Sequence, residues 1–251
     1  MKKRIVRIAL APIKYFDISK KDNLDKVKRY INLAGKKKAD IICFPESVLH
    51  KTDVLEINHP VVNEIQEECK KNNIWCIVTE DFKIKGKPFN IAILINRKGK
   101  IIGHYKKIYI HDEKVYPGNK VKVFKTDFGK IGIVICWDLV FPELFKKMNQ
   151  KGAEIIFCPA EWRYEEDCPT TNQFYKKRDI ELLKSLVMAR AFENMYFVAL
   201  CNPLTSEEDQ VSYSAIVSPH RVLKETIDEE TLMIADIDLN EINELKKLYT
   251  K

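Results

Sequence analysis

Short apolar runs alternate with amphipathic stretches along the whole chain. The first run, RIVRIALAPI, precedes a stretch over 21–37 whose apolar residues approximate helical spacing. The next run, ADIICFPES, precedes a second amphipathic stretch near 60–72, and the strand-like run IWCIVTEDF follows. This order predicts strands alternating with helices in the first third of the chain.

Hairpins enter the pattern after residue 87. PFNIAILINRKGKIIGHYKKI predicts a hairpin with its turn at Arg97-Lys98-Gly99, and VKVFKTDFGKIGIVICWD predicts two strands around a turn at Gly129. Further helices are predicted in PELFKKMNQKG, near 179–194 and from Asn240. Further strands are predicted in AEIIFCPA, MYFVALCNP, SYSAIVSPH, RVLKETI and TLMIADIDL. Strands outnumber helices, which indicates an α/β or α+β layered sandwich of mixed sheets covered by helices.

Nothing in the sequence marks a domain boundary. The 251 residues contain no internal repeat, Gly/Ser linker or low-complexity tract, and α/β folds of this length often form one unit. The Pro- and charge-rich stretch 163–178 is typical of a surface excursion rather than a linker. We therefore expect one domain over residues 1–251.

The net charge of +7 changes this picture little. Lys and Arg are interleaved with Asp and Glu along the chain, which favours a basic solvated surface over a nucleic-acid-binding module. The basic start MKKRIVRIALAPIKYF resembles a signal peptide, but Arg7 interrupts its apolar run and no small-residue cleavage site follows. Since no apolar stretch approaches about 18 residues, we expect no membrane span and a cytoplasmic protein.

Seven cysteines are present, an odd number without CxxC or zinc-finger spacing. We therefore expect no structural zinc, and a disulfide framework is disfavoured in a chain of this size without a secretion signal. Cys43, Cys76, Cys158 and Cys201 lie in strand-like runs, which is typical of buried, inert thiols. Cys136 ends such a run and is considered separately.

Three apolar runs lead directly into a reactive polar side chain. ADIICFPES reaches Glu46, KIIGHYKKIYI reaches Lys106-Lys107, and KIGIVICWDLVFPE reaches Cys136. Strand ends next to loops are where α/β folds gather functional groups. Taken singly, each has a structural alternative: a helix-start carboxylate, a solvated edge-strand charge or a core thiol. Together they match the needs of a thiol nucleophile, which requires a proton acceptor and a positive charge for the developing oxyanion.

The segments ICFPES, YKKIYI, ICWDLVFPE and ARAFEN resemble the four signature blocks of the nitrilase superfamily of carbon–nitrogen hydrolases, in the same order and at similar separations. FNIAILINRKGKIIGHYKK resembles the central hairpin of that family, and TLMIADIDL its closing strand. The cysteine block is the most specific part of the resemblance, which covers nearly the whole chain. It implies a four-layer α-β-β-α sandwich with two mixed β-sheets and a Glu-Lys-Cys triad.

By position in the blocks, the resemblance places the triad on Glu46, Lys107 and Cys136. Lys107 is preferred over Lys106 because an apolar residue and then usually a His or aromatic residue follow the lysine of the family. A second glutamate often precedes a Pro-Gly turn in the family, and here Glu113 precedes Pro117-Gly118, in a shorter loop.

The expected chemistry needs neither a metal nor an organic cofactor. Cys136 attacks the carbonyl carbon, Glu46 accepts the thiol proton and later activates water, and Lys107 with the backbone N–H of Trp137 stabilises the oxyanion. Glu161 and Trp162, in the PAEW segment after the next strand, are expected substrate contacts, with packing and capping as the alternative.

Other charged residues are expected to act beside the triad or to stabilise the fold. Glu113 is expected to orient substrate or Lys107, with a rim salt bridge as its alternative. Arg190 and Glu193, three residues apart in a predicted helix, are interpreted as a structural ion pair.

The acyl group of the substrate is left open between amides, N-carbamoyl compounds and nitriles. Relatives that act on N-carbamoyl amino acids are expected to carry arginines just after the nucleophile, where this chain has Leu139 and Val140. This favours a small-molecule amidase, although Arg163 could reach the cleft from another loop. The resemblance also implies a homodimer or higher homo-oligomer. A catalytically silent binding scaffold remains the non-enzyme alternative.

Overall fold

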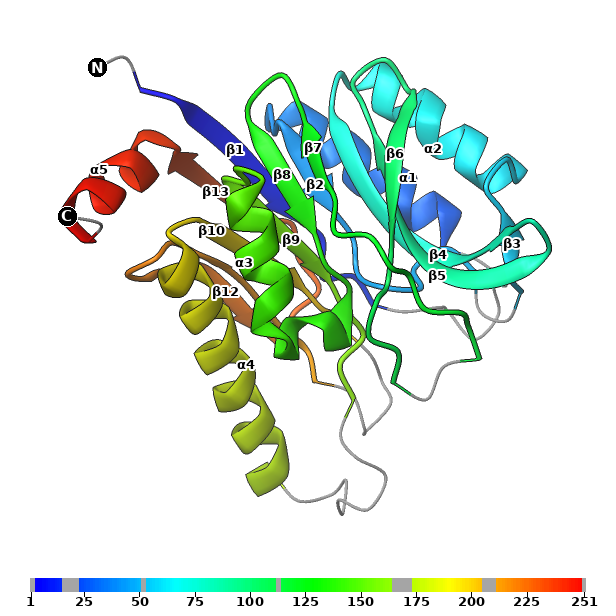
Figure 1. Ribbon diagram of the computed structural model, residues 1–251. Helices are drawn as coiled ribbons and strands as arrows, with labels where there is room; N and C mark the ends of the chain where they lie inside the picture. Colours follow the sequence, from blue (N-terminus) through cyan, green and yellow to red (C-terminus); the bar gives the residue numbers. More distant parts are fainter. Residues whose placement is uncertain are drawn as a thin grey trace.

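The computed structural model describes residues 3–14, 23–50, 53–111, 114–163, 173–204 and 211–249, and only the backbone of 173–176. Its helices are α1 (Leu24–Lys36), α2 (Pro60–Lys71), α3 (Pro142–Gln150), α4 (Gln173–Asn194) and α5 (Asn240–Tyr249), and a short 3-10 helix, η1, spans Cys136–Val140. All of them except α5, which follows the last strand, connect strands of two sheets (Figure 1).

The first sheet has the strand order β13 (Met233–Asp238), β1 (Ile5–Leu10), β2 (Ile41–Cys43), β4 (Trp75–Ile84), β5 (Lys87–Ile95) and β6 (Ile101–Lys106), with β3 (Leu55–Glu56) paired to β4. The second has the order β12 (Val222–Ile227), β11 (Tyr213–Val217), β10 (Phe197–Cys201), β9 (Ile155–Pro159), β8 (Lys130–Ile133) and β7 (Val123–Lys125). Both are mixed, because parallel pairs at their centres are flanked by antiparallel strands.

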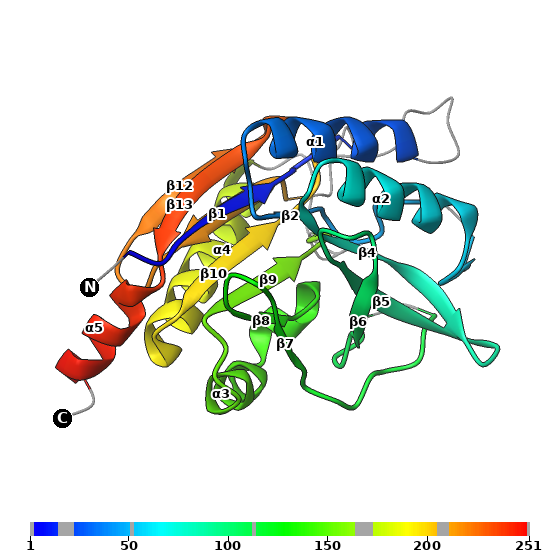
Figure 2. The ribbon, with the colours of Figure 1, turned by 90° about the horizontal axis from the view of Figure 1, so that it is seen from above.

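The two faces of the first sheet pack into different cores because successive side chains of a strand point to opposite faces. Along β4, Trp75 and Ile77 join the core shared with the second sheet, whereas Cys76 and Val78 pack with residues of α1 and α2. Figure 2 shows α1 and α2 on the outer side of the first sheet, with α3 and α4 beside the second. The predicted four-layer sandwich of two mixed sheets is confirmed.

Two boundaries differ from the sequence prediction. The long helix was predicted near 179–194, but α4 begins at Gln173, inside the stretch 163–178 that was interpreted as an excursion. Its extra first turn, QFYKKR, consists mainly of residues that helices tolerate well. The strand predicted to reach Cys136 ends at Ile133, although the N–H of Val134 still bonds the Phe157 carbonyl. The predicted turn at Arg97-Lys98-Gly99 is confirmed between β5 and β6.

Candidate active site

Glu46 lies in the loop that leaves β2 and crosses to the second sheet. Its backbone N–H donates to the carbonyl of Ala160, just after β9, at 3.2 Å. The residue is only 3% exposed. The carboxyl ends of parallel strands from the two sheets therefore meet at this point, and the glutamate carboxylate lies between them.

Lys107 follows β6 directly and points at Glu46. Its Nζ lies 2.9 Å from Glu46 Oε1, and the lysine is only 1% exposed. Asn90 on the neighbouring β5 donates its side-chain amide to the same oxygen at 2.9 Å and accepts the Lys107 backbone N–H. Lys106 places its ammonium over the Phe89 ring, 3.3 Å from the centroid. The structure therefore brings Lys107, and not Lys106, to the glutamate.

Cys136 occupies the first position of η1 in a left-handed backbone conformation, with φ of 45°. This conformation is strained for a residue with a Cβ and is common at functional sites. Burial raises the pKa of the Cys136 thiol well above its usual range, and the Glu46 carboxylate raises it further. Lys107 and the backbone N–H of Glu161 lower this pKa. Both predicted partners are therefore close enough to influence the thiol.

Asp138 fastens the cysteine turn to the segment that carries the lysine, a role the sequence analysis did not predict. Its buried carboxylate accepts the backbone N–H groups of Ile108 and Tyr109 on Oδ1, at 3.2 and 2.8 Å. On Oδ2 it accepts the Tyr105 hydroxyl at 2.8 Å and the Ile135 N–H at 3.0 Å. Burial raises the pKa of Asp138 to about 6. The sequence feature that could have indicated this role is a charged residue inside the apolar run CWDLVF.

The predicted substrate contacts lie close to one another and to Glu46. The backbone N–H of Glu161 donates to Glu46 Oε2 at 3.1 Å, while its carboxylate pairs with Arg163 at 2.5 Å. The rings of Trp137 and Trp162 lie with centroids 5.6 Å apart. A pair of indole rings and a charged pair thus lie in the segments that contain or adjoin the candidate nucleophile and its glutamate.

The remaining predicted residues lie farther out or outside the described segments. Glu113 falls outside the described residues, so its role stays a prediction. Arg190 and Glu193 form the expected ion pair at 3.3 Å. The Arg190 guanidinium also donates to the carbonyls of Leu139 and Val140, at 3.1 and 3.0 Å, and thereby supports the end of η1.

The buried-thiol prediction is confirmed for the four strand cysteines, Cys43, Cys76, Cys158 and Cys201. Burial raises the pKa of each of these thiols. Among the described residues, no group of three or more His, Cys, Asp or Glu side chains is placed to hold a metal ion. Within the same part of the chain, no helix is long and apolar enough to cross a membrane.

Comparison with known proteins assigns the chain to a family. A family model described as carbon-nitrogen hydrolase matches residues 7–247. The chain belongs to the carbon–nitrogen hydrolase family. Its relatives place it in the nitrilase superfamily as an amidase-like hydrolase, which confirms the resemblance seen in the sequence.

Individual relatives of this carbon–nitrogen hydrolase are similar over most of their length. It is 29% identical to the 2-oxoglutaramate amidase of Bacillus subtilis, over 92% of each chain. A carbon–nitrogen hydrolase from Helicobacter pylori has the same fold, with a TM-score of 0.89 at 21% identity, over 98% of this chain and 94% of its own. An amidase variant from Nesterenkonia, with the acetamide moiety of fluoroacetamide bound covalently to its active-site cysteine, has a TM-score of 0.79 at 18% identity, over 97% and 96%.

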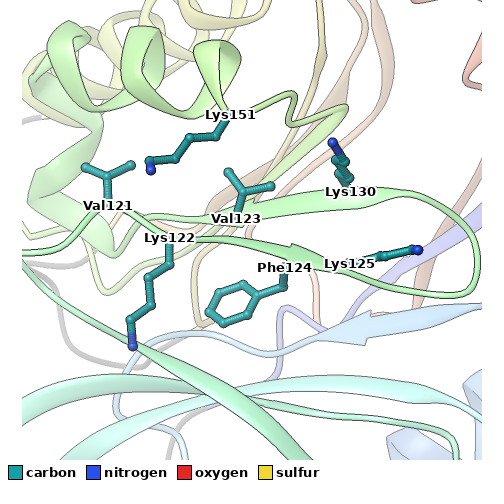
Figure 3. A pocket seen from close by; sticks show the side chains of 7 residues that line it. All are labelled: Val121, Lys122, Val123, Phe124, Lys125, Lys130 and Lys151. Carbon is teal, nitrogen blue, oxygen red and sulfur yellow. The ribbon is translucent and has the colours of Figure 1, made fainter.

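A separate cavity of about 460 Å³ in this carbon–nitrogen hydrolase lies along the β7–β8 hairpin and includes Lys151 at the end of α3. In Figure 3 the side chains of Val121 and Val123 point to the Lys151 side of the hairpin, whereas Lys122 points to the other side. The Lys122 ammonium donates to the carbonyl of His104 at 2.7 Å. The lysines therefore do not converge on one ligand position, and the candidate site remains the one around Cys136.

Proposed function

We propose that this chain is a small-molecule amidase in which Cys136 forms a thioester with the acyl group and ammonia is released. The observation that carries the proposal is the buried pair of Lys107 Nζ and Glu46 Oε1, 2.9 Å apart, beside the cysteine. Removing two charges from water is costly, and such a pair next to a thiol is typical of a catalytic site.

In the first half-reaction the Cys136 sulfur attacks the carbonyl carbon of the amide. Because burial raises its pKa, the thiol is protonated at neutral pH, and Glu46 accepts its proton as the carbon–sulfur bond forms. The carbonyl electrons move to oxygen, where the Lys107 ammonium and the Trp137 backbone N–H stabilise the negative charge. One such preorganised donor contributes on the order of 3 kcal/mol. The proton on Glu46 passes to the nitrogen, which leaves as ammonia.

In the second half-reaction water attacks the thioester carbonyl. Glu46, ionised again, accepts a proton from the water, and the collapse of the intermediate breaks the carbon–sulfur bond. The proton then returns to the sulfur, so that the free acid and the thiol are restored. Lys107 serves both half-reactions as a fixed positive charge, held by Glu46 and by the backbone of Asn90.

The residues directly after the nucleophile favour an amide over an N-carbamoyl amino acid. Leu139 and Val140, which lie in η1 just after the cysteine, carry no charge that could bind a substrate carboxylate. Arg163, paired with Glu161, is a cation in the segment that follows β9. The relative from Bacillus subtilis is named for an amide that bears a carboxylate. We propose that Arg163 plays the carboxylate-binding part when the acyl group is acidic, and that Trp137 and Trp162 contact its apolar portion.

The proposal is tested by trapping the acyl group. Wild type, E46Q and C136A are incubated with a panel of linear amides, and each intact mass is recorded. We expect E46Q to gain one adduct, located on Cys136 by peptide mapping, and C136A to gain none. C158S, which changes a buried strand thiol, is the matched control and should react like wild type. An adduct on another cysteine, or no turnover and no adduct with any amide, would contradict the proposal and favour a silent binding scaffold.

The expectations for assembly and location are also proposals. We propose that the enzyme associates as a homodimer and works in the cytoplasm. Sedimentation velocity at micromolar concentration should show a species of twice the 29.4 kDa chain mass. A monomer under these conditions, or recovery of the native protein in a membrane fraction, would contradict these proposals.

A further inference from the structure

Glu80 is a buried acid on the face of the first sheet opposite the candidate triad. It lies on β4 between Thr79 and Asp81, is 3% exposed, and alternates with residues that face the core between the sheets. Its carboxylate accepts three backbone N–H groups: those of Leu49 and His50 on Oε2, at 2.8 and 2.9 Å, and that of Asp81 on Oε1, at 3.0 Å. Burial raises the pKa of Glu80 to about 8.

The two N–H groups on Oε2 belong to the turn that follows Glu46. Ser47, the next residue, has a left-handed backbone with φ of 50°. The N–H of Val48 then donates to the carbonyl of Thr79 at 3.2 Å. Three consecutive backbone N–H groups, at positions 48 to 50, are thus tied to two adjacent residues of one strand. The position of the turn relative to β4 is therefore determined largely by Glu80.

Burying the Glu80 carboxyl group costs free energy, and the packing of this face does not require an acid at this position. A buried carboxyl group is unfavourable unless each oxygen has partners, and an apolar side chain on this face would join the core with α1 and α2. The Glu80 side chain is long enough to reach across to the turn and to accept two donors on one oxygen. Its geometry serves the turn rather than the core.

We propose that Glu80 is a positioning residue that holds the Glu46 carboxylate in register with Lys107 and Cys136. It acts through the backbone, because only Ser47 and Val48 separate Glu46 from the residues that Glu80 binds. The inference rests on the proposed role of Glu46 as proton acceptor. It predicts that the length of side chain 80 matters more for activity than its charge.

The test compares three substitutions with a matched control. E80Q keeps the length and one acceptor oxygen, whereas E80D moves the acceptors back by one methylene and E80A removes them. We expect kcat to stay within about threefold in E80Q and to fall tenfold or more in E80D and E80A, with KM changed less than threefold. The control is D40N, since Asp40 accepts the Arg7 N–H at 2.8 Å just before β2, at the far end of that strand from Glu46. D40N should lose thermal stability yet keep kcat.

A second readout does not depend on amidase turnover. The rate at which iodoacetamide alkylates Cys136 is measured against pH, because the Glu46 carboxylate raises the pKa of that thiol. In E80D and E80A the midpoint should move down, toward that of E46Q, and in D40N it should stay at the wild-type value. Unchanged midpoints in E80D and E80A would overturn the proposal, whether or not any amide is hydrolysed. So would a loss of kcat in D40N equal to that in E80D, because the effect would then be one of general stability.

Discussion

The hydroxyl of Tyr105 offers a clean perturbation of the connection between nucleophile and lysine. Tyr105 lies on β6, two residues before Lys107, is fully buried, and donates to Asp138 at 2.8 Å. Replacing it by phenylalanine removes one oxygen and leaves the ring. Tyr196 is the matched control: it is also fully buried, but its hydroxyl has no hydrogen-bond partner among the described residues.

The expected loss of stability in Y105F follows from the charge on Asp138. A hydrogen bond to a charged group contributes about 1.5–3 kcal/mol, against about 1 kcal/mol for a neutral one. We therefore expect Y105F to lower the free energy of unfolding by about 2 kcal/mol at pH 8, where Asp138 is ionised. Since the pKa of Asp138 is about 6, the loss should shrink toward about 1 kcal/mol at pH 5. Y196F should be neutral or slightly stabilising, because it removes an unsatisfied buried group.

Urea unfolding at pH 5 and pH 8 measures these differences, and in a chain of this size about 2 kcal/mol corresponds to roughly 4–8 °C in Tm. The activity of Y105F should fall by no more than about tenfold, because Asp138 keeps its three backbone donors. Equal stability losses in Y105F and Y196F, or a Y105F loss that does not depend on pH, would refute the assigned role of Asp138.

Three further predictions concern the buried charges. Glu46 raises and Lys107 lowers the pKa of Cys136. The pH midpoint for alkylation of this thiol by iodoacetamide should therefore move to lower pH in E46Q and to higher pH in K107M. Shifts of both midpoints in the same direction would contradict the geometry. The pKa of Glu80 is raised from 4.5 to about 8 in the folded chain, so this carboxyl group ionises at lower pH in the unfolded chain. The free energy of unfolding should therefore fall by up to about 5 kcal/mol between pH 4.5 and 8 and stay constant above pH 8. E80Q should lack that contribution in urea titrations across this range, and a slope equal to wild type would argue against burial of the carboxyl. Asn90→Ala removes a hydrogen-bond donor to the Glu46 carboxylate, and a hydrogen bond to a charged group contributes about 1.5–3 kcal/mol. We therefore expect kcat to fall about 10- to 100-fold, with little change in substrate affinity measured by stopped flow. An unaltered kcat would exclude Asn90 from positioning that carboxylate.

Local patterns in the sequence indicated a layered sandwich of mixed sheets, and the resemblance to the nitrilase superfamily implied its four layers and the candidate nucleophile. The continuous apolar run IWCIV predicts a strand, and the two faces of that strand pack into the two separate cores. Apolar runs lead into Glu46, the Lys106-Lys107 pair and Cys136, and the resemblance implied the choice of Lys107. Such signals are readable because they depend on residues within a few positions of one another.

Only the tertiary structure decided the partners of the buried polar groups. Asp138 is a single acid inside an apolar run, and Glu80 is one of two adjacent acids near the end of another. Nothing local indicates that Asp138 binds the segment after β6 or that Glu80 binds the turn after Glu46. Each bond joins segments about 30 residues apart, and the bond between Asn90 and Glu46 spans 44. A hydrogen bond requires atoms within about 3 Å at a favourable angle, which depends on strand order, register and the packing of the two sheets. The spacing of apolar and polar residues along the chain determines none of these quantities. The residues that hold the site together could therefore be identified only in the folded chain.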